Sequence, residues 1–361
     1  MSGKWLNVLA VVVWATILTA CMDYGPIERE SISSSGRGLF IVCEGNFMYG
    51  NASLSYYDID SMKVQNTVFA RVNGKRLGDV AQSMAVRDGR GYIVVNNSGV
   101  IYVIDPETFE WIGEIKGLLS PRYIHFLDDR KAYVTDLYSP YISVIDPLEM
   151  RITKRIPVGF ADKTRPSTEQ MVQWDKYVFT NCWSYDDKIL IIDTERDTLD
   201  GYIEVGMQPT SIVIDCNEKI WVVTDGGYEN SPMGQEPGAL YRIDPATRRI
   251  EQTFPFAFGE SGSELCTNGR RDTIFFIQKH VWSMNVNATE FPQQPFLEND
   301  TKNYWYGLAV DPKTSEVYLA DAIDYTQSGV IYRYSPKGVL LDRFEVGIIP
   351  GAFCFTEGDG H

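Results

Sequence analysis

Polar side chains recur at one position of the chain, at the end of short apolar runs with the composition of β-strands. Each run ends in a carboxylate or a side-chain amide. The seven residues are Glu44, Asn96, Asp136, Asn181, Asp225, Gln278 and Asp321. As a ring they could hydrogen-bond the amides of a ligand or hold Ca²⁺. Taken singly, each is better interpreted as bonding to the backbone of its own turn.

Aromatic side chains gather in the longer segments beside these polar residues, whereas the other connections are short and charged. They are Phe47, Tyr49, Tyr123, Tyr138, Trp183, Tyr185, Tyr228, Tyr304, Trp305, Tyr306 and Tyr325. We expect some to pack between elements and the rest to form an apolar surface with polar tips, as in small-molecule sites. The predicted ligand-binding set is completed by Asn96, Arg122, Asp136, Asn181, Asp225 and Asp321.

Catalytic groups are sparse. The three histidines are His125, His280 and His361, and none has an evident Ser or Cys partner for nucleophilic catalysis. No His/Cys cluster suggests zinc, and no glycine-rich loop suggests a bound phosphate. Asp225 and the pair Asp186-Asp187 could serve acid–base chemistry. The sequence therefore favours a binding protein without a cofactor over an enzyme.

The polar and aromatic positions recur because the chain repeats. Apolar residues followed by Asp, and in three copies then by Pro, occur at 102–106, 143–147, 190–193 and 241–245. Weaker copies occur at 55–58, 282–285 and 332–336. Seven strand-like copies about 41–51 residues apart are typical of four-stranded propeller blades. The sequence therefore predicts an all-β, seven-bladed β-propeller over residues 38–357.

Each copy resolves into strands. In the third blade, strands are predicted at 122–126, 131–135, 141–145 and 151–157. The first blade offers strands at 39–43, 54–57 and 64–70, but no innermost strand precedes them. Residues 351–355 can supply it, so we expect the C-terminal strand to pair with the N-terminal blade and close the ring. Residues 286–303 are irregular and rich in Pro and Gln, so the outer strand of the sixth blade has the weakest sequence signal.

Composition limits the class of partner. The chain has 361 residues, 44% of them hydrophobic, which suffices for a sizeable core. Its net charge is −15. Nucleic-acid binding needs a basic face, so this class is disfavoured.

The N-terminus carries the features of an export signal. Residues 1–20 hold one charge, Lys4, followed by an apolar run too short to span a membrane. The run ends in Leu18-Thr19-Ala20-Cys21, which resembles a bacterial lipobox, so Cys21 is the predicted lipid anchor. Residues 21–37 are polar and predict a flexible tether. The five other cysteines are odd in number and irregularly spaced, which favours buried free thiols over disulfides.

Two stretches resemble a known family. Glu44-Gly45-Asn46-Phe47 with residues 50–58, and residues 306–312 with 320–325, resemble the first and last blades of YncE-like propellers in Bacteroidetes lipoproteins. That branch includes BtuG-type proteins. The resemblance implies a surface lipoprotein of the outer membrane that captures cobalamin or a related corrinoid. It also implies a BtuB-type TonB-dependent transporter as the protein partner.

Two other functions remain open at this point. One is a lactonase-like hydrolase with a central Ca²⁺, for which Glu44, Asp136, Asp225 and Asp321 supply carboxylates. The other is a protein-interaction platform without a small ligand, which the fold alone does not exclude.

Overall fold

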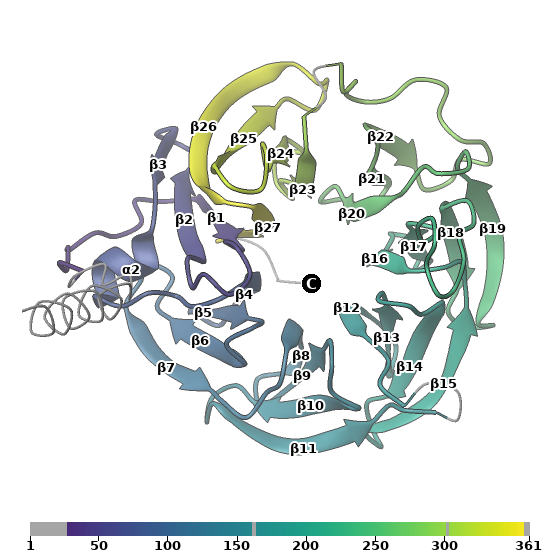
Figure 1. Cartoon of the computed structure of the whole chain (residues 1–361), viewed down its shortest axis with the longest axis horizontal. Coiled ribbons are helices and arrows are strands. Elements are labelled where there is room, and N and C mark those ends of the chain that lie inside the picture. The colour runs from purple at the N-terminus through teal and green to yellow at the C-terminus, as the bar shows by residue number, and fades with distance from the viewer. Residues whose placement is uncertain (1–26, 161–163, 301–302, 357–361) are drawn as a thin grey trace, which may run out of the picture.

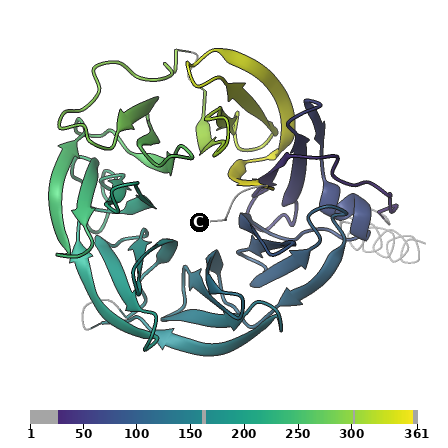
Figure 2. The ribbon, with the colours of Figure 1, turned by 180° about the vertical axis from the view of Figure 1, so that it is seen from behind.

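The strands form seven sheets arranged as the blades of a wheel around one central axis (Figure 1). The computed structural model describes residues 27–160, 164–300 and 303–356. Figure 2 shows the same ring of blades from behind. The predicted seven-bladed β-propeller is confirmed.

Each blade is an antiparallel sheet whose first-named strand lies nearest the axis and whose last-named strand lies outermost. Blade 1 contains β27 (Pro350–Phe355), β1 (Gly38–Cys43), β2 (Ser53–Asp58) and β3 (Lys63–Gln65). Blade 2 contains β4 (Ala81–Arg87), β5 (Arg90–Val95), β6 (Val100–Ile104) and β7 (Trp111–Ile115). Blade 3 contains β8 (Pro121–Asp128), β9 (Lys131–Asp136), β10 (Tyr141–Asp146) and β11 (Arg151–Pro157). Blade 4 contains β12 (Thr168–Trp174), β13 (Tyr177–Cys182), β14 (Lys188–Asp193) and β15 (Thr198–Glu204).

The remaining blades complete the circle. Blade 5 contains β16 (Pro209–Ile214), β17 (Ile220–Thr224), β18 (Ala239–Asp244) and β19 (Arg249–Pro255). Blade 6 contains β20 (Ser263–Thr267), β21 (Thr273–Gln278) and β22 (His280–Asn285). Blade 7 contains β23 (Trp305–Val310), β24 (Val317–Asp321), β25 (Ser328–Tyr334) and β26 (Leu340–Ile348).

The ring closes as predicted. The C-terminal strand β27 pairs antiparallel with β1, in a register that places Leu39 opposite Phe355 and Val42 opposite Ala352. Thr356 extends this pairing, because its amide donates to the Gly38 carbonyl. The first and last segments of the chain therefore share one blade, and neither leaves an open innermost edge.

The polar residue that ends each copy of the sequence repeat, Asp146 in blade 3, has a structural role that explains why the repeat recurs at this spacing. It lies at the end of the third strand of each blade, where the chain turns toward the outer strand. In blade 3, Asp146 Oδ1 accepts hydrogen bonds from the amides of Leu148 and Glu149 at 3.0 and 3.1 Å. The equivalent residues Asp58, Asp105, Asp193, Asp244, Asn285 and Ser335 also accept turn amides. The repeat is thus a turn signal.

Two outer strands differ from expectation. In blade 1 the strand predicted at 64–70 is wrong after its first residues, because β3 ends at Gln65 and the helix α2 (Val68–Asn73) follows. The helix buries Val68 and Phe69 and ends at Gly74, whose left-handed backbone suits a helix C-terminus. In blade 6, no outer strand is present in 286–300 or 303–304, the described part of this connection. Leu297 instead bridges to Val281 of β22.

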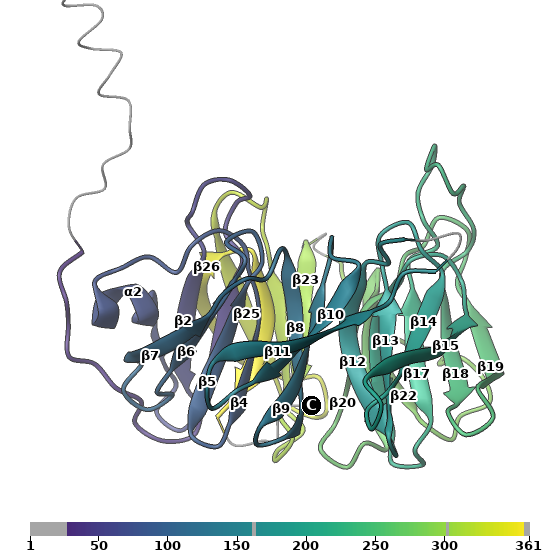
Figure 3. The same ribbon diagram turned by 90° about the horizontal axis from the view of Figure 1, so that it is seen from below.

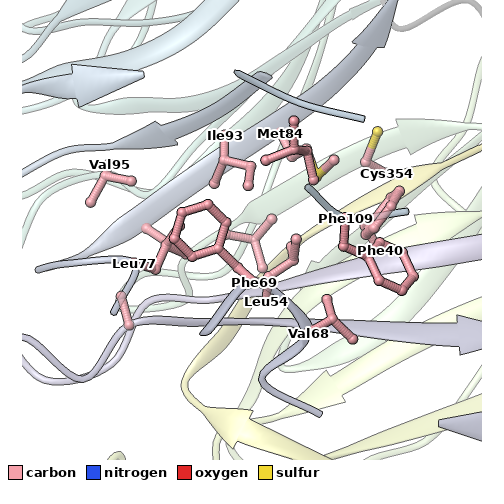
Figure 4. Close-up of a cluster of buried hydrophobic side chains, with 14 of the residues drawn as sticks. Phe40, Leu54, Val68, Phe69, Leu77, Met84, Ile93, Val95, Phe109 and Cys354 are labelled. Atoms are coloured by element: carbon pink, nitrogen blue, oxygen red, sulfur yellow. The ribbon is translucent and has the colours of Figure 1, made fainter. Parts of the chain in front are cut away.

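Seven apolar clusters hold the blades together, one between each pair of neighbours. Figure 4 shows the cluster between blades 1 and 2, where Phe40 and Phe69 pack with Ile93 and Cys354. Because the core is divided this way, each blade depends on both neighbours for its buried surface.

Cysteines 43, 182, 216, 266 and 354 are all free thiols, as predicted. Three are buried, whereas Cys216 is exposed in the turn after β16, contrary to the expectation of burial. The predicted signal, residues 1–20, and Cys21 lie outside the described residues. Among those described, no helix has the length and apolar character to cross a membrane.

Candidate ligand-binding site

The two faces of the wheel differ in chemistry. The rim face, at the upper edge of Figure 3, carries the loops between the second and third strands of each blade and the connections between blades. The turn face carries the tight turns. The exposed aromatic side chains of the rim face are Phe47, Tyr49, Tyr138, Trp183, Tyr185, Tyr228, Phe258, Tyr304 and Tyr325. Among the described residues, no turn of the turn face bears an exposed aromatic side chain.

One aromatic cluster lies over blade 7. The ring of Tyr325 lies 5.7 Å from the rings of both Tyr304 and Tyr306, edge-on to each. Tyr325 has a left-handed backbone (φ 62°), a costly conformation for a bulky residue. The Asn46 side chain holds this loop by donating to the Tyr325 carbonyl at 2.6 Å. The loops of blades 1 and 7 therefore present these rings in a fixed arrangement.

A second aromatic cluster lies over blades 4 and 5. The hydroxyls of Tyr185 and Tyr228 are 2.8 Å apart, and their rings meet edge-on at 6.4 Å. Beside them, Trp183 Nε1 donates to Asp225 Oδ2 at 3.3 Å. Gln208 also donates to this carboxylate, and burial raises the pKa of Asp225. This cluster combines exposed rings with a half-buried carboxylate.

The other predicted aromatics divide into two groups. Phe47, Tyr49 and Tyr138 are exposed on the rim, whereas Tyr123, Trp305 and Tyr306 are partly buried. Phe258, which is 68% exposed in the connection from blade 5 to blade 6, was not among the predicted binding residues. An aromatic residue in a connection between blades was the signal available for it.

Most of the seven polar residues at the strand ends form hydrogen bonds with the protein's own backbone. Asp136 accepts the amides of Leu119 and Ser120 with one oxygen, and those of Tyr138 and Ser139 with the other. Asn96 and Asn181 donate to the next blade, and Asp321 accepts two loop amides. All four are buried. Of the predicted polar ligands, Asp225 and Arg122 remain partly exposed.

An irregularity at the rim end of every innermost strand brings a different polar set to the axis. The register between the two innermost strands shifts there in all seven blades. A β-bulge of this kind re-aims the side chain at the extra residue. The residues at the shifts include Gln82, Arg122, Glu169, Thr210, Glu264, Tyr306 and Gly351. We call Gln82, Arg122, Glu169, Glu264 and Tyr306, with Glu44, the central polar cluster.

Arg122 connects three blades within this cluster. Its Nε lies 2.7 Å from Glu169 Oε2 of blade 4, and its Nη1 donates to Gln82 of blade 2. Burial opposes the charge of Arg122, but the nearby Glu169 keeps the arginine pKa above its ordinary value. The other oxygen, Glu169 Oε1, is buried and accepts no hydrogen bond from the described residues. This oxygen is therefore a buried acceptor whose hydrogen-bonding capacity the described residues leave unused.

The remaining members lie near blades 1, 6 and 7. The Tyr306 hydroxyl is 3.1 and 3.2 Å from the two Glu44 oxygens. Gly351 leaves room for them, since a Cβ there would lie 2.6 Å from Glu44 Oε1. Burial raises the pKa of Glu44 to about 7. Burial, together with the nearby negative charge of Glu44, raises the pKa of Glu264 to about 8. These carboxyls exchange protons near neutral pH and, when protonated, can donate to a ligand carbonyl.

The raised pKa of Glu264 predicts a stability effect. The folded state keeps its proton up to about pH 8, while an unfolded glutamate ionises near 4.5, so the unfolding free energy falls as pH rises between these values. Glu264→Gln should remove this loss and stabilise the protein at pH 9, by roughly 2–4 kcal/mol, with little effect at pH 5. Urea unfolding at both pH values measures it.

Glu290→Gln is a control at an exposed carboxylate and should leave the pH profile unchanged. A Glu264→Gln variant that is no more stable at pH 9 than the parent would contradict the assignment.

The central cluster was mostly missed from the sequence, where Arg122 and Tyr306 alone were in the predicted binding set. Its signal is an ionisable or amide residue near the start of an apolar innermost strand, as at Gln82, Glu169 and Glu264. Within the described residues, no group of three or more His, Cys, Asp or Glu side chains is placed to hold a metal ion.

Comparison with known proteins decides the family. The model of a domain of unknown function, DUF5074, matches residues 37–345. The chain belongs to the DUF5074 family. A curated relative, antigen Lp49 of Leptospira interrogans, is 29% identical over 110 residues, covering 27% of this chain. The match spans about a quarter (23%) of that relative's length.

Solved structures of low identity share the fold. A quinonprotein alcohol dehydrogenase-like protein of Bacteroides thetaiotaomicron is 15% identical with a TM-score of 0.67, covering 89% of this chain and 79% of that one. A periplasmic gluconolactonase of Pseudomonas aeruginosa is 13% identical with a TM-score of 0.63, covering 88% and 99%. At this identity, the likeness of this DUF5074 propeller to both extends to the fold alone.

Proposed function

We propose that this DUF5074 propeller captures cobalamin or a related corrinoid on its rim face, without catalysis, and passes it to a TonB-dependent outer-membrane transporter. The observation that carries the proposal is the gathering of exposed aromatic rings on one face, around an axis lined by the central polar cluster. A corrinoid is a broad disc with amide-tipped arms. Aromatic faces suit the disc, and carboxyl, amide and guanidinium groups suit the arms.

The rim aromatics should act as anchors. Trp183→Ala and Tyr325→Ala should each weaken corrinoid binding by about 1–3 kcal/mol, a factor of roughly 5–150 in Kd. Titration of the purified protein with cobalamin and with cobinamide, followed by calorimetry and corrin absorbance, measures the effect.

Trp111→Ala is the matched control, because Trp111 is exposed on the outer strand β7, away from the rim. It should bind with the parent's affinity. Failure of the parent protein to bind any corrinoid would remove the proposed function.

A lactonase-like hydrolase is the second candidate. Two observations favour it: the shared fold with a gluconolactonase and the near-neutral pKa of Glu44 and Glu264, which suits acid–base chemistry. Lactone hydrolysis by the parent, lost in Glu44→Gln, would support this reaction over simple capture.

The proposed location follows from the predicted lipid on Cys21. A lipid-modified cysteine would anchor the protein to the outer membrane, where it could meet the transporter. Labelling with a fatty-acid analogue, abolished by Cys21→Ala, tests the anchor separately from corrinoid binding.

A further inference from the structure

A cavity of about 410 Å³ lies at the rim end of blade 6. It occurs where this blade departs from the other six, because residues 286–300 form no outer strand. The segment meets the edge of β22 at one point, where Val281 and Leu297 each donate an amide to the other's carbonyl. Figure 1 shows the segment as a long loop outside β22. The cavity is bounded by this loop, by β22 and by the connection from blade 5.

Aromatic rings from three separate segments line this cavity. Phe256 comes from the connection between blades 5 and 6, Trp282 from β22 and Phe291 from the loop. The Trp282 and Phe291 rings are 4.8 Å apart and inclined at 59°. Phe256 meets Phe291 edge-on at 6.0 Å. Because the three planes are inclined to one another, they form walls that face in different directions.

Hydrogen bonds fix the orientation of Trp282 and connect it to a carboxylate. The indole Nε1 donates to Gln278 Oε1 at 2.9 Å and to the Gln278 carbonyl at 3.0 Å. The side-chain nitrogen of Gln278 donates in turn to Glu260 Oε2. Gln278 is buried, which strengthens this chain of hydrogen bonds. The Glu260 carboxylate is therefore held in place near the aromatic rings.

The lining carries an excess of negative charge. Glu260 and Glu298 contribute two carboxylates, and Lys279, exposed at the tip of the turn between β21 and β22, contributes one ammonium group. His280 Nδ1 accepts the Asn299 amide at 2.9 Å, so this imidazole is neutral and adds no positive charge. The net charge of −15 on the whole chain also attracts cations.

We propose that this cavity binds an organic cation whose ammonium nitrogen bears methyl groups or other carbon substituents. Aromatic faces attract such cations through the ring quadrupole. A primary ammonium group has three N–H donors that need acceptors, and the rings supply none. A substituted ammonium group has few or no N–H donors, so it suits aromatic walls beside carboxylates. The volume of the cavity lies within the range of small-molecule sites.

This site is separate from the proposed corrinoid site. Its lining includes none of the exposed rim aromatics and no member of the central polar cluster. The proposal therefore goes beyond the proposed function and does not depend on it. Loss of either binding activity leaves the other to be judged by its own measurement.

Choline and two matched analogues test the class of ligand on the purified protein. The alcohol 3,3-dimethylbutan-1-ol has the shape of choline without its charge, and ethanolamine keeps a positive charge on a primary ammonium group. We expect choline to bind with a Kd below about 1 mM, and each analogue to bind at least about fivefold more weakly. Calorimetry and ligand-observed NMR measure the affinities. Equal binding of either analogue, or no binding of choline at about 10 mM, would overturn the proposal.

Two substitutions assign the binding to this cavity. Trp282→Leu keeps an apolar side chain but removes the aromatic face, so choline should bind about tenfold more weakly. Glu260→Gln keeps an acceptor for Gln278 but removes the charge. It should weaken choline binding about threefold and leave binding of the neutral alcohol unchanged.

Trp111→Leu and Glu107→Gln are the matched controls, because both side chains are exposed on blade 2, away from the cavity. They should bind choline as the parent does. Thermal unfolding verifies that each variant is folded, and Glu260→Gln decides the outcome if Trp282→Leu does not fold. Choline binding that the folded cavity variants retain in full would place the cation elsewhere and reject this site.

Discussion

A chain that stops after Ile349, and so lacks β27, is expected to lose its cooperative unfolding transition. The truncation exposes the inner edge of β1 and removes Ala352 and Cys354 from the packing between blades 1 and 2. It also removes Phe353 and Phe355 from the packing between blades 7 and 1. A typical domain is stable by only about 5–15 kcal/mol, so the loss of two interblade contacts exceeds what the ring can tolerate. Thermal unfolding followed by circular dichroism measures the effect.

A chain that stops after Thr356 is the matched control, because it keeps β27 and two hydrogen bonds to Gly38: the Thr356 amide donates to the Gly38 carbonyl, and the Gly38 amide donates to the Thr356 hydroxyl. It should unfold cooperatively near the parent's midpoint. A cooperative transition in the shorter chain as well would mean that six blades and an incomplete first blade are self-sufficient.

Replacement of Arg122 by methionine should destabilise the protein by about 3–5 kcal/mol, because it leaves a buried carboxylate without its ionic partner. Glu169 is 3% exposed, and Arg122 is the cation that pairs with its carboxylate. Glu169 can relieve the loss by taking up a proton. The destabilisation should therefore be larger at pH 9 than at pH 5, and denaturant unfolding at the two values measures it.

The double variant Arg122→Met, Glu169→Leu supplies the control. Because it removes both charges, it should recover much of the lost stability and show little pH dependence. A double variant as unstable as the single one would place the effect in packing around Arg122 and not in the unpaired carboxylate.

The wheel could be predicted because its determinants are local. Each blade repeats a turn whose amides bond to a polar side chain, as at Asp146, and that requirement leaves a regular mark in the sequence. The closing strand could be predicted by counting the strands of each blade, because the first blade lacked an innermost strand and residues 351–355 offered one. In blade 3, the predicted outer strand and the observed β11 have the same bounds.

The features that the sequence did not predict depend on contacts between distant segments. Residues 64–70 have strand composition, but burial of Val68 and Phe69 against neighbouring residues favours the helix α2. The central polar cluster depends on the register shifts of the innermost strands, and the polar residue near the start of each strand does not by itself show where the register shifts. Asp136 and Asp321 accept amides of their own loops, and a carboxylate at a strand end has the same sequence signal whether it binds a ligand or its own turn.

The cysteines differ in reactivity, and this difference allows the protein to be attached to a surface through one face. Burial raises the pKa of Cys43 and Cys354 to about 12, so these thiols stay protonated and inert at neutral pH. Cys216 is the exposed thiol of the described residues, and it lies in a turn on the turn face. A maleimide surface should therefore immobilise the protein through Cys216 with its aromatic face pointing into solution, ready for direct kinetic measurements with candidate ligands.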